Sequence, residues 1–283
     1  MTTYAKDVLV ETDWLADHAK DPNVRAFEVD VDTTAYDQGH IAGAIGLNWR
    51  TDLQQHPVRD LIEKRQLEEL LAKNGITPAT TIVAYGDNNN WFAAWFFWLL
   101  KYYGHKDVKL VNGGRAKWIA EKRPLSDDAP SYAKSEYRAG TPDASIRALR
   151  DYVLDKVVSD NAKIVDVRSP KEYAGELLAP ENMPQEGAQR GGHIPGAQNI
   201  PWATAVAEDG RFKSADELKS IYGSKGIDGS GETIAYCRIG ERSAHTWFVL
   251  KYLLGQERVR NYDGSWTEWG SLIGVPIEKS ATS

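Results

Sequence analysis

Cysteine is almost absent from this chain of 283 residues, because Cys237 is the only one. No disulfide can form within the chain, which excludes the disulfide framework of small extracellular domains. The six histidines show no metal-ligand spacing, so we expect no bound metal.

Long apolar runs and an excess of positive charge are also missing. The longest apolar stretch, residues 91–100, is shorter than the roughly 20 residues that cross a bilayer. Residues 1–7 lack the apolar core of a signal peptide. The net charge of -6 does not favour nucleic acid or an anionic membrane surface. We therefore expect a cytoplasmic monomer that binds neither nucleic acid nor membrane.

The chain is long enough for two ordinary domains, and its second half repeats motifs of its first half. The motifs recur in one order: residues 39–44 as 192–197, residues 81–85 as 233–236, residues 112–114 with Trp118 as 263–265 with Trp269, and residues 26–30 as 163–167. This order indicates two copies of one fold rather than a solenoid of short repeats.

Each copy alternates short β-rich runs with helical stretches, which predicts an α/β fold. In the second copy the expected strands are 164–167, 198–200, 233–236 and 259–262, and the expected helices include 215–222 and 243–254. This alternation favours a central, mostly parallel sheet with helices on both faces. We predict an N-terminal domain at 1–125, a linker at 126–144 and a C-terminal domain at 145–283, with an insertion at 175–191 that is special to the second copy.

The most informative motif is the hexapeptide that follows the strand 233–236: Cys237-Arg238-Ile239-Gly240-Glu241-Arg242. A loop between a strand and a helix, at the carboxyl end of a parallel sheet, is where α/β folds bind ligands. A cysteine that ends a core strand can also be an inert packing residue. Two arginines within five residues, at the start of a helix, favour a functional thiol.

The expected electrostatics of this loop favour a thiolate at Cys237. The N-terminus of the next helix attracts anions, and Gly240 allows successive N–H groups to point inward. Arg238 and Arg242 add positive charge, so we expect a lowered pKa for the thiol. Glu241 acts in the opposite direction, and we expect it to point outward or to pair with an arginine.

Several motifs together resemble the tandem rhodaneses over essentially the whole chain. They are the paired His-Ile-x-Gly-Ala motifs, Asp166-Val167-Arg168, Asp263-Gly264-Ser265-Trp266, and the cysteine loop. Continued to Ser243, the loop is similar to that of bacterial thiosulfate sulfurtransferases. The resemblance implies two rhodanese-like domains, with the C-terminal one catalytic.

The resemblance also implies a reaction. Cys237 attacks the outer sulfur of thiosulfate, sulfite leaves, and cyanide or a thiol removes the sulfur from the cysteine persulfide. The loop from Arg238 through Ile239, Gly240 and Glu241 to Arg242 would bind donor and persulfide. Asp166, Arg168 and Ser243 would support the site. No external cofactor is needed, since the enzyme itself carries the sulfur.

The chain departs from the family pattern in both copies. Gly86 takes the cysteine position in the first copy, which we therefore expect to be catalytically inactive, and Asn88–Asn90 are expected to form a solvated loop. Glu172 occupies a position where mitochondrial members carry a substrate-binding arginine, and Arg190 is a candidate replacement.

Two further side chains also have purely structural interpretations. Instead of supporting the site, Arg168 could form an ion pair that ties a loop to the sheet. His245, on the first turn after the loop, is expected to be a packed or exposed helix residue rather than a general base.

Three alternative functions remain open. A 3-mercaptopyruvate sulfurtransferase shares the tandem architecture, although its loop resembles Cys-Gly-Ser-Gly, without the charge of Arg238. A phosphatase of the related fold has five residues between cysteine and arginine, whereas four separate Cys237 from Arg242 here. A non-catalytic binding module would fit the first copy better than the second.

Overall fold

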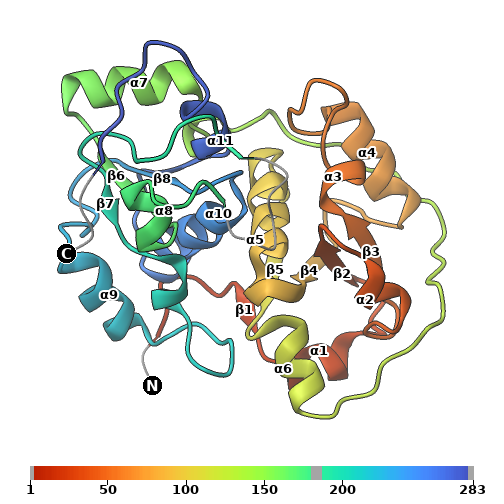
Figure 1. Ribbon diagram of the computed structural model, residues 1–283. Coiled ribbons are helices and arrows are strands. Elements are labelled where there is room, and N and C mark those ends of the chain that lie inside the picture. The colour runs from red at the N-terminus through yellow and green to blue at the C-terminus, as the bar shows by residue number, and fades with distance from the viewer. Residues whose placement is uncertain (1–2, 180–186, 280–283) are drawn as a thin grey trace. The chain divides into compact units, whose positions relative to one another are not determined.

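A computed structural model describes residues 3–179 and 187–279 of the chain, which divides into two compact units (Figure 1). The N-terminal unit comprises Asp7–Asp143 and Glu208–Phe212. The C-terminal unit comprises the described residues of Met1–Lys6, Ala144–Ala207 and Lys213–Ser283. The short segment 208–212 of the second repeat therefore belongs to the first unit, where the Phe212 N–H donates to Asn112 Oδ1 at 3.0 Å.

The N-terminal unit is built on a parallel sheet with the strand order β1-β5-β4-β2-β3. Its strands are β1 (Leu9–Val10), β2 (Val24–Asp30), β3 (Ile45–Asn48), β4 (Thr81–Tyr85) and β5 (Val108–Val111). Its helices are α1 (Thr12–His18), α2 (Thr34–Asp37), α3 (Trp49–Asp52), α4 (Lys64–Lys73), α5 (Asp87–Tyr102) and α6 (Gly114–Ala120).

Helices cover both faces of this sheet. On one face Leu15 of α1 and Trp118 of α6 join the apolar cluster of the strands. On the other face α5 packs on β2 (Figure 1). The rings of Phe96 and Phe27 lie 5.3 Å apart in this contact. Burial on both faces explains why the central strands are apolar almost throughout.

The C-terminal unit repeats this arrangement with the parallel order β7-β6-β8-β9. Its strands are β6 (Lys163–Asp166), β7 (Gln198–Asn199), β8 (Thr233–Tyr236) and β9 (Val259–Tyr262). Its helices are η1 (Ala144–Ile146), α7 (Arg150–Ser159), α8 (Pro170–Ala174), η2 (Trp202–Ala205), α9 (Ala215–Gly223), α10 (Glu241–Phe248), η3 (Val249–Leu253) and α11 (Ser265–Trp269).

The two faces of the second sheet are covered as in the first. Val153 of α7 and Trp269 of α11 belong to the apolar cluster on one face. Helix α10 packs on β8 and β9, and η3, a π-helical turn, continues it. The predicted α/β fold with two similar domains is therefore confirmed.

Two details differ from the sequence-based expectations. The sheet register pairs Glu28 with Tyr85 in the first unit and Asp166 with Tyr236 in the second, so Glu28 and Asp166 are structural counterparts. The sequence match of 26–30 with 163–167 was therefore shifted by one residue. Helix α10 begins at Glu241, two residues earlier than expected, so Glu241 and Arg242 lie on its first turn rather than in the loop.

The remaining connections are irregular. Residues 127–143 contain no helix or strand, and residues 180–186 of the insertion at 175–191 lie outside the described residues. No helix among the residues that the structure describes is long and apolar enough to cross a membrane.

Candidate active site

Cys237 directly follows β8 and is fully buried. Arg238–Gly240 connect it to α10, and Gly240 turns the chain with a φ of 102°. A Cβ at Gly240 would lie 2.7 Å from Cα of Asp263, so only glycine fits there. In this conformation the Gly240 N–H points at the sulfur and donates to Cys237 Sγ at 3.1 Å.

The first two residues of α11, Ser265 and Trp266, hold the loop in place. The hydroxyl of Ser265 accepts the Cys237 N–H at 3.1 Å and donates to the carbonyl of Tyr262 at 2.6 Å. Ser265 has a φ of 51°, a left-handed conformation, and the glycine at its counterpart position, Gly114, has a φ of 58°. The Trp266 N–H also donates to the carbonyl of Cys237, at 3.1 Å. Sequence reasoning used Ser265 only as part of a motif and assigned it no role.

A second hydroxyl faces the sulfur. Ser243 Oγ, on the first turn of α10, lies 3.6 Å from Cys237 Sγ and 2.7 Å from Asn261 Oδ1. The amide of Asn261 also donates to the carbonyl of Gly240 at 3.2 Å. The predicted supporting residue Ser243 is therefore brought to the cysteine, together with Asn261, which the sequence did not indicate.

Glu241 was expected to point outward or to pair with an arginine, and the structure shows the second arrangement, with Glu241 Oε1 3.5 Å from Arg242 Nε. The side chain of Glu241 is buried and its Oε2 lies 3.3 Å from Cys237 Sγ. The reason is the early start of α10, which places Glu241 on the inner side of the first helical turn.

The expected lowering of the Cys237 pKa is wrong for the resting site. Burial raises the pKa of the thiol, and the negative charge of Glu241 raises it further. Arg242 and Ser243 act in the opposite direction without outweighing these effects. Burial and the charge of Glu241 both favour the neutral thiol in the resting site.

Arg242 lies on the first turn of α10 and not in the loop where the sequence placed it. It is 3 % exposed, and its two terminal nitrogens donate to the two carboxylate oxygens of Glu172 at 3.0 Å each. Its Nε also lies 3.5 Å from Glu241. Burial would raise the pKa of Glu172, but hydrogen bonding to Arg242 and the positive charge of Arg242 lower it overall. Glu172 is therefore a buried partner of the loop.

The two remaining loop side chains are also buried. Arg238 and Ile239 are each 3 % exposed. The loop is fixed at Arg238, whose carbonyl accepts the Thr267 N–H at 3.0 Å.

Asp166 and Arg168 form a buried ion pair behind the cysteine strand. Arg168 Nη2 lies 2.6 Å from Asp166 Oδ2 and 2.7 Å from the carbonyl of Gly192. The hydroxyl of Tyr236 donates to Asp166 at 2.6 Å and accepts the Ile194 N–H at 3.1 Å. This network ties the loop at 192–197 to the sheet, in agreement with the structural interpretation of Arg168.

Arg190 and His245 lie in other surroundings. The guanidinium of Arg190 donates to the carbonyls of Gly270 and Leu272, after α11, so it braces that turn and is not brought to the cysteine loop. Burial lowers the pKa of His245 to about 3, and its ring lies edge-on to Trp202, which fits the packed histidine that we expected.

The corresponding place in the N-terminal unit could not hold a cysteine. Gly86 follows β4, and a Cβ there would lie 2.5 Å from the carbonyl of Val29. Asn88, Asn89 and Asn90 then form a left-handed turn, with φ values of 50°, 53° and 65°.

Gly86 is surrounded by polar groups at the position that corresponds to Cys237 in the other unit. Asn90 Oδ1 accepts the Gly86 N–H at 3.0 Å. Burial raises the pKa of the neighbouring Asp30 to about 8. The expectation that Asn88–Asn90 form a solvated loop is wrong for Asn90, which is buried.

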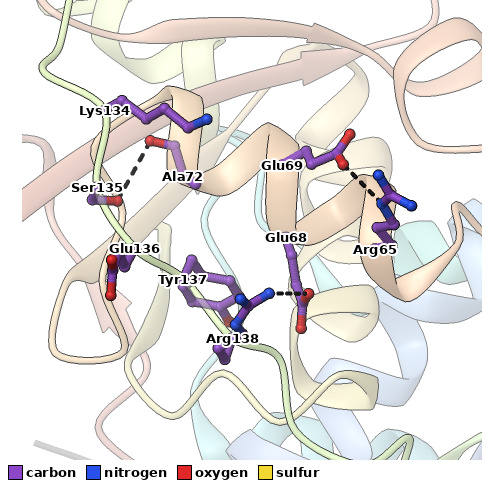
Figure 2. Close-up of a pocket in the computed structure, with 9 residues that line it drawn as sticks. All are labelled: Arg65, Glu68, Glu69, Ala72, Lys134, Ser135, Glu136, Tyr137 and Arg138. Carbon is purple, nitrogen blue, oxygen red and sulfur yellow. Dashed lines mark hydrogen bonds and ion pairs between the residues drawn. The ribbon is translucent and has the colours of Figure 1, made fainter.

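A surface cavity of about 630 Å³ lies along α4 of the N-terminal unit (Figure 2). Its walls carry charges that are mostly paired, as in the contacts of Arg65 with Glu69 and of Arg138 with Glu68. The linker forms the other wall, held by the hydrogen bond from Ser135 N to the carbonyl of Ala72 at 2.9 Å. None of its lining residues belongs to the predicted site. Among the described residues, no cluster of His, Cys, Asp or Glu could hold a metal ion.

Two copies of an α/β domain, one with a cysteine loop and one without, match a known family. The family model described as a rhodanese-like domain matches residues 11–121 and again residues 149–272. The chain belongs to the rhodanese-like family, in its tandem form, as the sequence motifs indicated.

Within the rhodanese-like family, two similar relatives carry names that refer to sulfur transfer. The chain is 56% identical over 273 residues to a protein of Saccharopolyspora erythraea named "Putative thiosulfate sulfurtransferase", covering 96% of each chain. It is 55% identical over 276 residues to the "Sulfur carrier protein TtuD" of Thermus thermophilus, covering 96% of this chain and 97% of the other.

A solved structure with the same architecture is SseA from Escherichia coli, described as a 3-mercaptopyruvate sulfotransferase. It superposes with a TM-score of 0.78 at 26% identity, over 94% of this chain and 99% of that chain. These comparisons confirm the predicted membership in a sulfurtransferase family.

Proposed function

We propose that the protein is a thiosulfate sulfurtransferase that moves sulfane sulfur from thiosulfate to cyanide or a thiol through a persulfide on Cys237. The observation that carries the proposal is the sulfur's surroundings. The Gly240 N–H lies 3.1 Å from Sγ and the Ser243 hydroxyl 3.6 Å, at the N-terminus of α10. The Gly240 N–H and the positive end of the helix stabilise the negative charge of a persulfide, while the Ser243 hydroxyl beside it donates its proton to Asn261 Oδ1 at 2.7 Å.

The reaction follows from this arrangement. Sγ attacks the outer sulfur of thiosulfate, the S–S bond of the donor breaks, and sulfite leaves with the bonding electrons. The outer sulfur stays on Cys237 as a persulfide until a thiophilic acceptor takes it. The covalent intermediate divides the transfer into two steps and requires no external carrier.

Donor binding depends on the charges of the loop. Arg238 and Arg242 both lie beside the connection from Cys237 to α10, but Glu172 already neutralises Arg242. We therefore assign the sulfonate end of thiosulfate to Arg238 and the loop N–H groups, and we give Arg242 a structural part. The second candidate donor is 3-mercaptopyruvate, because SseA shares the fold and because the paired Arg242 leaves less positive charge for a dianion.

Other activities fit less well. A phosphatase needs the loop arginine to hold a phosphate, whereas Arg242 is bound on both terminal nitrogens by Glu172. A binding module without chemistry would not require a buried thiol at a helix N-terminus with a backbone N–H directed at its sulfur. A catalytic thiol must stay reduced, which supports the prediction of a cytoplasmic location. A monomer remains our prediction for the oligomeric state, which sedimentation equilibrium would measure.

The direct test is intact-mass analysis after incubation with thiosulfate, followed by cyanide. We expect one added sulfur atom that cyanide removes, with release of sulfite and then thiocyanate. Cys237→Ser, which keeps the size of the side chain, should carry no sulfur. If mercaptopyruvate loads Cys237 and thiosulfate does not, the second candidate donor is correct. If neither donor loads it, the proposed chemistry is wrong.

A further inference from the structure

A carboxylate touches the sulfur that is proposed to react. Glu241 Oε2 lies 3.3 Å from Cys237 Sγ, both groups are buried, and the thiol is oriented as the hydrogen-bond donor. Two negative charges so close together in a buried site would repel each other strongly. The pair therefore holds one proton between two groups at rest, with the proton on sulfur.

The charges around this pair are already matched. Glu172 binds both terminal nitrogens of Arg242, the cation next to Glu241. On the neighbouring elements, Arg168 pairs with Asp166 and Arg147 with Asp263.

Arg238 is a further buried cation of the loop. If the thiolate formed while Glu241 stayed charged, the site would gain a negative charge. A proton moved to Glu241 avoids that charge.

We propose that Glu241 is a catalytic proton acceptor, which takes the Sγ proton of Cys237 during attack on the sulfur donor and returns it when the acceptor removes the sulfur. This inference rests on the proposed function and adds a residue to it. The Glu241 oxygen is within reach of the proton in the resting structure, which is the first requirement for a general base.

The two half-reactions balance with this proton. In the first, the thiol, the Glu241 carboxylate and thiosulfate give the persulfide anion, the Glu241 carboxylic acid and sulfite. The new S–S bond forms as the S–S bond of thiosulfate breaks, and sulfite leaves with the electron pair. In the second, cyanide takes the outer sulfur as thiocyanate, and the thiolate left on Cys237 recovers the proton from Glu241. No other oxidant, reductant or proton source is needed.

The test is Glu241→Gln, an isosteric change that cannot accept the proton. The direction in which the rate of persulfide formation changes separates two roles of Glu241. If Glu241 only raised the pKa of the thiol, its removal would give more thiolate and faster persulfide formation at pH 7. If Glu241 is the proton acceptor, persulfide formation at pH 7 should fall by about 10²-fold or more, since general bases contribute about 10²–10⁴-fold. The rate should recover as rising pH ionises the thiol.

The measurement is single-turnover persulfide formation, followed by rapid quench and intact mass across a pH series. Glu257→Gln, at an exposed carboxylate of the same unit, is the matched control and should keep the wild-type rate. Thermal unfolding checks that each variant is folded. Glu241→Asp keeps a carboxylate on a shorter side chain, so it should lose less rate and keep the wild-type shape of the pH profile.

The outcomes distinguish the inference from the proposed function. A rate in Glu241→Gln equal to or above the wild-type rate at pH 7 would overturn the role of Glu241 while leaving the persulfide on Cys237 intact. The same holds if Glu241→Asp is as slow as Glu241→Gln and shares its pH profile. Failure of the wild-type protein to form a persulfide with either donor refutes the proposed function itself, and the inference with it.

Discussion

Replacing Glu172 by glutamine should destabilise the C-terminal unit and also change how the site handles anions. Glu172 is 1 % exposed and accepts hydrogen bonds from both terminal nitrogens of Arg242 at 3.0 Å each. Glu172→Gln removes the negative charge of this pair and turns one of the two accepting oxygens into an amide group, while the contact of Arg242 Nε with Glu241 at 3.5 Å remains. Removal of one partner of a buried ion pair costs about 3–5 kcal/mol. A loss of 3 kcal/mol corresponds to a fall of about 6–12 °C in the melting temperature of a domain of this size.

The assay is thermal unfolding by circular dichroism across pH, with Glu257→Gln as a control at an exposed position. Arg242 lowers the folded-state pKa of Glu172 below its ordinary value of 4.5. The stabilisation by the ion pair is therefore present above pH 4.5 and is lost as the pH falls through the lower, folded-state pKa. The difference between wild type and Glu172→Gln should be full at pH 7 and should shrink below pH 4.

The same variant tests donor binding. Without the negative charge of Glu172, Arg242 keeps only the more distant carboxylate of Glu241 at 3.5 Å, so the site becomes more positive and the KM for thiosulfate should fall relative to that for mercaptopyruvate. A variant with wild-type melting temperature at pH 7 would refute the assigned role of the ion pair. A lower melting temperature with unchanged donor preference would refute only the argument about charge.

Three further predictions concern single side chains. Arg238→Gly should raise the KM for thiosulfate by about 10- to 100-fold, since a charge-assisted hydrogen bond contributes about 1.5–3 kcal/mol, and steady-state kinetics with both donors would show whether selectivity stays unchanged instead. Gly86→Cys should form no second persulfide by intact mass and should destabilise the N-terminal unit by about 1–3 kcal/mol, because its Cβ would meet the carbonyl of Val29 at 2.5 Å; a second added sulfur would contradict this. Burial raises the pKa of Asp30 to about 8, so the contribution of Asp30 to the free energy of unfolding is full below pH 4 and declines towards pH 8. Urea titrations at a series of pH values should show a smaller decline of the unfolding free energy between pH 4 and pH 8 in Asp30→Asn. The same decline as in the wild type would contradict this prediction.

Much of the fold and the centre of the candidate site could be predicted because both are local in the sequence. The expected strands at 233–236 and 259–262 match β8 and β9, and Cys237 stands at the predicted strand-to-helix junction. Motif repeats gave the tandem architecture, which needs only the order of similar segments.

Side-chain directions could not be predicted, because they depend on the phase of a helix and on distant partners. A start of α10 two residues early turned Glu241 and Arg242 inward, and a local sequence window does not fix that start. Glu172 lies 70 residues before its partner Arg242, so nothing near the loop signals the pair. In the sequence Glu172 stood out only because mitochondrial family members carry a substrate-binding arginine at that position. In the structure its carboxylate is the charged partner that a buried arginine needs.

The left-handed residue that begins α11 differs between the two copies. Gly114 adopts this conformation without a Cβ clash, whereas Ser265 adopts it in the copy with the cysteine, where its hydroxyl receives the Cys237 N–H. A left-handed non-glycine residue costs on the order of 1 kcal/mol. The copy with the cysteine therefore gives up some stability at a position where the copy with Gly86 is relaxed. Selection for stability alone would favour glycine at 265, so the serine is a trade of stability for a fixed cysteine.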